Sequence, residues 1–157
     1  MEPRFPILMV SACLAGVACR YNGDAYPVAA VEDLVRAGDA LPICPERLGG
    51  LPSPRQPVEW RDGKAVDEQG GDWTAAFVSG AQQAARVAKT LGCTGAILKA
   101  RSPSCGCGCI YDGSFSHTRI AGDGLFIRLL KEQGVQVITE EEELAAFLCR
   151  HCGGKHG

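Results

Sequence analysis

The strongest constraint on this chain is a loop rich in cysteine, serine and glycine that directly follows a short apolar segment. Residues 95–100 read GAILKA and predict a buried strand, and residues 101–109 then hold three cysteines, two serines and two glycines. In open α/β sheets, ligands bind beyond the carboxyl ends of the strands. Polar loops rarely bury three thiols without a ligand or a bridge. We therefore expect this loop to carry a functional site.

The cysteine count points to a reducing compartment. The chain holds nine cysteines in 157 residues, and its first six residues, MEPRFP, lack the apolar run of a secretory signal. We therefore expect a cytoplasmic protein, in which thiols are more often metal-binding or catalytic than disulfide-bonded. The net charge of −2 gives no general attraction to nucleic acid or to an anionic membrane. Apolar runs long enough for a membrane-spanning helix are missing from the sequence.

Short apolar segments alternate with segments of helical periodicity, which predicts a single three-layer α/β domain. The fold expected is a mostly parallel sheet with helices on both faces and two small β-hairpins. We expect the domain to span residues 1–148 and residues 149–157 to form a flexible tail that contains cysteine and histidine. The predicted strands cover residues 7–10, 40–44, 95–100 and 135–138, and the predicted helices cover residues 27–37, 72–91, 124–133 and 139–149.

Local signals support several of these boundaries. Asp72 is expected to cap the second helix, and Thr139 with Glu142 forms the pattern of a capping box for the last one. The hairpins are expected around two Asp-Gly pairs, at residues 62–63 and 112–113.

Three predicted strands each deliver a cysteine to the same edge of the sheet. These cysteines are Cys13, Cys44 and Cys105. Thiolates suit zinc or an iron–sulfur cluster. Three protein ligands, rather than four, would leave one metal position open to substrate. Glu46 and Ser102 belong to the same loops, where a carboxylate and a hydroxyl could move protons and orient a substrate.

Two other interpretations compete with a catalytic metal site. Cys13 and Arg20 are similar to the nucleophile and arginine of a small cysteine phosphatase, but six residues separate them where that motif has five. The extra residue would break the phosphate cradle, and this interpretation leaves Cys44 and Cys105 unexplained. The second alternative is a zinc-binding structural module.

Several motifs, in order, resemble the thiouracil desulfidase family. They span most of the chain, from about residue 7 to residue 140. They read SACLAG at 11–16, CRYNG at 19–23, CPERLGGLPSPR at 44–55, LKARSPSCG at 98–106 and YDGSF at 111–115.

The resemblance implies a [4Fe–4S] cluster held by three cysteines, with a fourth iron free to take the sulfur of a thiocarbonyl substrate. Water then replaces the sulfur on the heterocycle. Carried over by motif, the ligands are Cys13, Cys44 and Cys105, while Glu46 and Ser102 occupy positions that assist proton transfer and substrate activation. The expected partner is a small thiolated heterocycle, neither a membrane nor a nucleic acid.

The chain also departs from the family pattern. Cys107 and Cys109 stand where small residues without a thiol are more usual. Together with Cys149 and Cys152 they suggest a structural zinc site. Cys19 lies within a family-like segment and receives no ligand role here.

Overall fold

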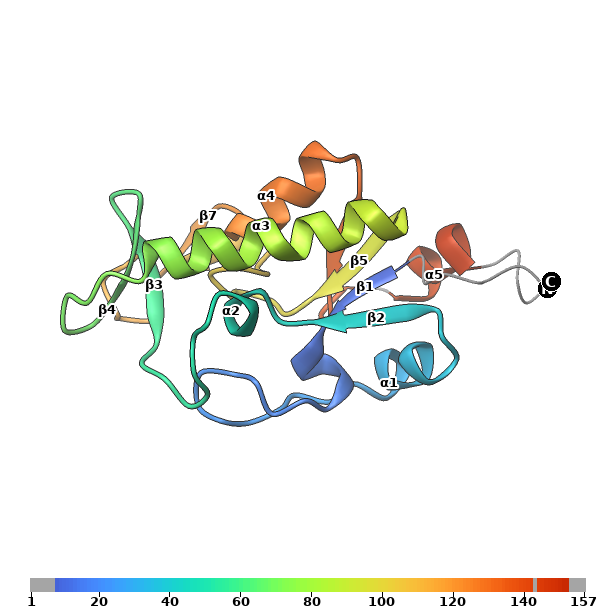
Figure 1. The fold of residues 1–157 in the computed structure, drawn as a ribbon, viewed down its shortest axis with the longest axis horizontal. Helices are drawn as coiled ribbons and strands as arrows, with labels where there is room; N and C mark the ends of the chain where they lie inside the picture. Colours follow the sequence, from blue (N-terminus) through green and yellow to red (C-terminus); the bar gives the residue numbers. More distant parts are fainter. Residues whose placement is uncertain (1–7, 143, 153–157) are drawn as a thin grey trace.

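A four-stranded parallel sheet forms the centre of the molecule (Figure 1). The structure, a computed structural model, describes residues 8–142 and 144–152. The strands lie in the order β2-β1-β5-β8. They are β1 (Leu8–Ser11), β2 (Ala40–Ile43), β5 (Gly95–Leu98) and β8 (Gln136–Thr139). The parallel sheet predicted from the alternating pattern is thus confirmed.

The order of the strands creates a switch point between β1 and β5. Leu8 of β1 lies opposite Ala40 on one side and Gly95 on the other. The chain therefore leaves β1 toward β2 and later returns to the other side of β1 to form β5. In open α/β sheets, the crevice at such a reversal is where ligands bind.

Helices cover both faces of the sheet, as the sequence predicts. In Figure 1, α3 and α4 lie above the sheet and α1 lies below it, with α5 beside the sheet near the end of the chain. The helices are α1 (Ala29–Arg36), α3 (Thr74–Leu91), α4 (Leu125–Glu132) and α5 (Leu144–Cys152). No helix of the described residues is long and apolar enough to cross a membrane.

Alternation along β1 divides the core into two layers. Met9 packs with α3 and α4, whereas Leu8 and Val10 pack with α1 and α5 on the opposite face. All three side chains are fully buried. Burial of an aliphatic side chain of this size contributes about 1.5–3 kcal/mol. The central strand therefore anchors both layers at once.

The helix predicted from Asp72 begins two residues later, at Thr74, with Trp73 in the capping position. The Asp72 carboxylate still accepts hydrogen bonds from the amide of Thr74 at 2.9 Å and from its hydroxyl. The amide of Ala65 donates a hydrogen bond to the Thr74 hydroxyl. This bond connects the start of α3 to a small hairpin.

The first of the two predicted hairpins is confirmed. It pairs β3 (Val58–Arg61) with β4 (Lys64–Asp67), and Asp62 and Gly63 form the turn with positive φ angles. Positive φ at both turn positions is what an Asp-Gly hairpin turn requires.

The second predicted hairpin is wrong in its register. The structure pairs β6 (Cys109–Tyr111) with β7 (Arg119–Ala121), so residues 112–118 form a loop instead of a two-residue turn. The Glu59 carboxylate accepts hydrogen bonds from the amides of Gly113 and Phe115, and the Asp112 carboxylate accepts one from the amide of Ser114. These side-chain bonds replace the ladder bonds that the predicted hairpin needs.

The last helix begins and ends later in the chain than expected. It runs from Leu144 to Cys152, so part of the predicted tail is helical, and residues 153–157 lie outside the described part of the chain. Glu142 accepts a hydrogen bond from the amide of Thr139, but Thr139 belongs to β8, five residues before Leu144, so the predicted capping box does not cap this helix.

A close backbone contact positions the short helix α2 (Pro45–Leu48) against α3. A Cβ atom added to Gly80 would overlap the carbonyl oxygen of Pro45, and one added to Gly49 would overlap the carbonyl oxygen of Ala76. Two glycines therefore allow the backbones to touch. The residues at the start of α2 depend on this contact for their position.

We expect Gly80→Ala to lower the free energy of unfolding by about 1–3 kcal/mol, since the added methyl overpacks the contact with α2. The gain in helix propensity, about 1 kcal/mol, does not offset the overlap. Urea denaturation would measure the change. Ser79→Ala, at an exposed position of the same helix, is the matched control and should stay within about 0.5 kcal/mol of the parent. A Gly80→Ala protein as stable as the parent would contradict the contact.

Candidate functional site

A pocket of about 360 Å³ opens at the switch point between β1 and β5. Loops that follow β1, β2 and β5 form its walls, so it lies at the edge predicted from the sequence. All five predicted site residues line it: Cys13, Cys44, Glu46, Ser102 and Cys105.

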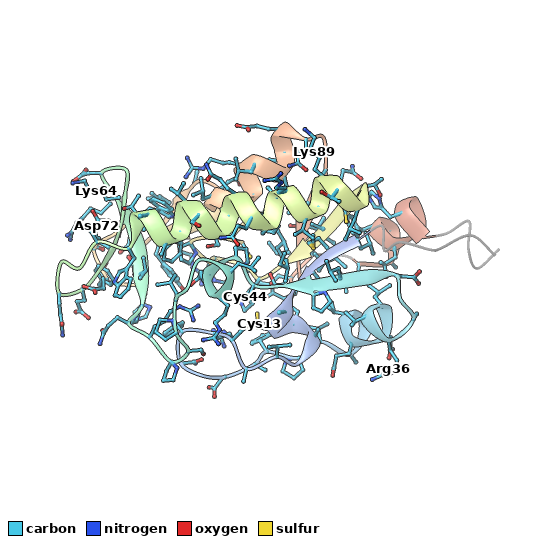
Figure 2. The ribbon with its side chains drawn as sticks, viewed as in Figure 1. Cys13, Arg36, Cys44, Lys64, Asp72 and Lys89 are labelled. Atoms are coloured by element: carbon cyan, nitrogen blue, oxygen red, sulfur yellow. The ribbon has the colours of Figure 1, made fainter. Side chains whose placement is uncertain are left out.

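Each predicted cysteine is held by the element that follows its strand. Cys13 lies in the 3₁₀ helix η1 (Ala12–Ala15), directly after β1. Cys44 occupies the capping position of α2, directly after β2, and Figure 2 shows it near Cys13 at the same end of the sheet. Cys105 lies in the loop after β5 and is buried. Three segments distant in sequence thus bring their thiols to one pocket.

A fourth thiol, that of Cys19, belongs to the same group. It is buried and forms hydrogen bonds with the thiols of Cys13 and Cys44. The loop after η1 folds back on itself, since the amide of Tyr26 donates to the carbonyl of Cys13 at 2.9 Å. The sequence analysis gave Cys19 no role, although its place six residues after Cys13 was a signal that both belong to one loop.

Three of these thiols, those of Cys19, Cys44 and Cys105, have raised pKa values. Hydrogen bonding with Cys13 is the main cause that raises the pKa of Cys19 to about 11. Hydrogen bonding with Cys19, followed by burial, raises the pKa of Cys44. Burial raises the pKa of Cys105, and the nearby Cys44 and Glu46 add to this effect. Thiolates gathered in this way need a cation to compensate their charge, and a metal centre would supply it by displacing the protons.

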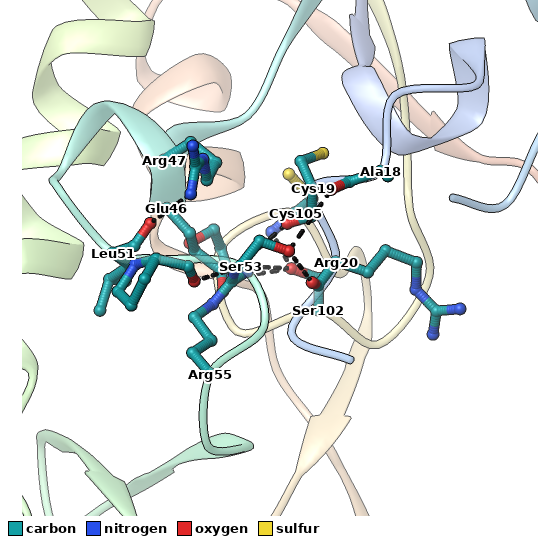
Figure 3. A network of polar contacts seen from close by, with 12 residues as sticks. Ala18, Cys19, Arg20, Glu46, Arg47, Leu51, Ser53, Arg55, Ser102 and Cys105 are labelled. Atoms are coloured by element: carbon teal, nitrogen blue, oxygen red, sulfur yellow. Dashed lines mark hydrogen bonds and ion pairs between the residues drawn. The ribbon is translucent and has the colours of Figure 1, made fainter. Parts of the chain in front are cut away.

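The carboxylate of Glu46 is shared between two partners (Figure 3). Its Oε1 atom accepts hydrogen bonds from Arg55 Nη2 at 2.7 Å and from Arg55 Nε at 3.2 Å. Its Oε2 atom accepts a hydrogen bond from the hydroxyl of Ser102 at 3.3 Å. Glu46 and Ser102, which are 56 residues apart, are therefore joined directly at the pocket.

The Ser102 hydroxyl also accepts hydrogen bonds from the amides of Ser104 at 3.2 Å and Cys105 at 3.1 Å. These two donors leave the hydroxyl proton to point toward Glu46. The same hydroxyl thus links the loop of Cys105 to the carboxylate on α2.

Two basic side chains of the pocket wall, Lys99 and Arg20, lie against the ring of Tyr26. Lys99 forms an ion pair with Glu140 at 2.9 Å and lies 4.7 Å from the ring centre of Tyr26. Arg20 lies over the same ring at 5.7 Å. His117, a residue that the sequence analysis did not consider, also lines the pocket. It follows Cys105 by twelve residues, so no pattern in the cysteine loop indicated it.

The phosphatase interpretation does not fit this geometry. A phosphate cradle needs free amides in the loop after the nucleophile, but the amide of Gly16 donates to the carbonyl of Cys13 and that of Cys19 donates to the carbonyl of Val17. The guanidinium of Arg20 lies against tyrosine rings. Loop amides that are already bonded cannot wrap a phosphate.

The predicted structural zinc site stays a prediction, although the structure shows where two of its segments lie. Cys107 packs with the core layer of α3 and α4, whereas Phe147 of α5 packs with the layer on the other face of the sheet. The helix that carries Cys149 and Cys152 thus lies across the sheet from Cys107. The side chains of Cys149 and Cys152 lie outside the described part of the structure.

Comparisons with known proteins place the chain among its relatives. A family model described as 2-thiouracil desulfurase matches residues 8–142. A Bacillus subtilis protein described as uncharacterized protein YbbK is 40% identical over 146 residues, which cover 87% of this chain and 97% of the relative. The solved structure of a [4Fe-4S]-dependent thiouracil desulfidase, TudS, is similar with a TM-score of 0.85 at 40% identity, and the match covers 94% of this chain and 98% of that one.

We expect Cys19 in the metal-free chain to react slowly with iodoacetamide. A pKa of about 11, compared with the ordinary value of 9.0, lowers the thiolate fraction at about pH 8 roughly a hundredfold. The rate should keep rising with pH until about pH 11. Mass spectrometry of the alkylated peptide would measure it, with a free peptide of residues 17–22 as the control. Equal rates for the protein and the peptide at about pH 8 would contradict the thiol contacts.

Proposed function

Because this chain belongs to the 2-thiouracil desulfurase family, we propose that it is a [4Fe–4S]-dependent desulfidase that acts on a thiolated pyrimidine such as thiouracil. The products are the oxo-pyrimidine and sulfide, since the reaction exchanges the sulfur of C=S for the oxygen of water. The observation that carries the proposal is the convergence of three strand-end cysteines, Glu46 and Ser102 on one pocket.

The residues present fit an iron–sulfur cluster. The donor set consists of thiols, which are the usual ligands of such clusters. Among the described residues, no three His, Cys, Asp or Glu side chains are grouped to hold a single metal ion. Thiolates that bind different irons of one cluster need not meet around one ion. We propose Cys13, Cys44 and Cys105 as the ligands, because each lies in the segment that follows a strand of the sheet and lines the pocket.

When bound, the cluster supplies a soft Lewis acid for the sulfur of the thiocarbonyl group. The chain itself must then orient the pyrimidine and move protons. Glu46 is suited to take a proton from the attacking water and return it to the leaving sulfide, because it lines the pocket and its Oε2 atom is bound only by the hydroxyl of Ser102 among the described residues. Ser102 is suited to orient the substrate through its hydroxyl, whose position two backbone amides fix.

We expect Cys44→Ser to abolish the broad visible absorbance of the anaerobically reconstituted protein, because a hydroxyl is a poor ligand for iron in a cluster. Iron and acid-labile sulfide per chain would be measured together with the spectrum. Cys93→Ala is the matched control, since Cys93 is buried in the layer of α3 and α4 and does not line the pocket. A full complement of iron and sulfide in Cys44→Ser would overturn the ligand assignment.

We expect Glu46→Gln to bind iron and sulfide normally and to lose about 10²–10⁴-fold in turnover, the usual contribution of a positioned acid–base group. Ser102→Ala should lose less, because a hydroxyl that orients substrate acts through one hydrogen bond. Uracil formation and sulfide release from 2-thiouracil would be measured at matched iron occupancy. Turnover of Glu46→Gln at the parent rate would show that the carboxylate does not take part, and absence of sulfide release by the loaded parent would reject the proposed function.

A further inference from the structure

Arg55 makes more polar contacts in the pocket than the proposed reaction uses. Two nitrogens of its guanidinium donate to Oε1 of Glu46, and Nη1 donates to the carbonyl of Cys19 at 3.1 Å and to that of Pro52 at 2.9 Å (Figure 3). The side chain is only 7% exposed. A buried arginine with this many partners holds a single orientation.

The loop of Cys19 does not depend on the Arg55 side chain alone. The hydroxyl of Ser53 donates to the carbonyl of Arg20 at 2.6 Å, and the backbone amide of Arg55 donates to the carbonyl of Tyr21 at 2.6 Å. These bonds already join residues 19–21 to residues 53–55. The paired donation to Glu46 therefore needs a reason other than holding the loops together.

The pairing decides which oxygen of Glu46 is available. Both Arg55 donors engage Oε1, so Oε2 remains for Ser102 and the pocket. Without the guanidinium, the carboxylate could rotate and present either oxygen in several directions. Small misplacements of a reacting group lower rates strongly, because productive geometry is narrow.

We propose that Arg55 is a positioning residue for the reaction, which fixes Glu46 so that Oε2 faces Ser102 and the substrate. This inference rests on the proposed function. It goes beyond it by assigning a role to a residue that acts through Glu46 and not on the substrate.

The positive charge of Arg55 provides a readout that is independent of turnover. The guanidinium lies close to the thiol group, because Nη1 donates to the carbonyl of Cys19 at 3.1 Å and Cys19 lines the pocket with the proposed ligands. A nearby cation also stabilises the reduced form of an iron–sulfur cluster. Arg55→Met should therefore lower the reduction potential of the loaded protein, whereas Arg55→Lys, which keeps the charge, should leave it near the parent value.

Measurements of turnover distinguish a positioning role of Arg55 from an effect of its charge. We expect Arg55→Met to lower kcat about 10–100-fold with KM within about twofold, because substrate contacts remain while the carboxylate loses its orientation. Arg55→Lys should also lose kcat, since an ammonium lacks the paired donors of the guanidinium fork. Arg47→Met is the matched control: Arg47 is exposed on α2 beside Glu46 and makes one long bond to the carbonyl of Leu51.

A double-mutant cycle with Glu46→Gln tests whether Arg55 acts through Glu46. All variants would be reconstituted and compared at equal iron and sulfide content. If Arg55 acts through Glu46, Arg55→Met should cost less than about threefold in the Glu46→Gln background. Losses of kcat that multiply in the double mutant would overturn the inference, and so would a normal kcat in Arg55→Lys. In either case, sulfide release by the parent would still support the proposed function. A loaded parent that releases no sulfide would reject the proposed function itself.

Discussion

The parallel pairing of β1 with both β2 and β5 is the constraint on which the site depends. This register aligns the carboxyl ends of three strands, and each strand is followed within a few residues by a cysteine, namely Cys13, Cys44 and Cys105. Burial of Leu8, Met9 and Val10 on both faces keeps the central strand in this register. A shift by one residue would exchange the two faces of β1 and break both core layers.

Close contacts around the parallel sheet position the polar groups of the pocket. The glycine contact of Gly49 and Gly80 brings α2 against α3 and so determines where Glu46 lies. The Glu46 carboxylate is 12% exposed and would be costly to bury alone, but Arg55 compensates its charge with two hydrogen bonds. The thiols show the reverse situation. Arg55 lowers the pKa of Cys19, but hydrogen bonding with Cys13 and burial raise it more. Carboxylate and thiols thus differ in a physical way: the charge of the first is compensated within the chain, whereas raised pKa values keep the thiols of Cys19, Cys44 and Cys105 protonated until a bound cationic group replaces their protons.

Much of this arrangement could be predicted from local sequence. The wrong prediction of the second hairpin shows where such reasoning fails. The strands, the helices and the first hairpin follow from periodicity and turn residues, which act over a few positions. The second hairpin failed because Glu59, far away in sequence, captures the amides of Gly113 and Phe115.

The sequence by itself determined the fold class, the edge of the sheet where the site lies, and five residues that meet there. Alternation and strand-end position suffice for this, because parallel strands must share an edge. Tertiary structure alone decided that Cys19 joins the other thiols, that Arg55 engages one oxygen of Glu46, and that His117 reaches the pocket. Such contacts join loops whose paths depend on packing, and no local periodicity specifies the path of a loop.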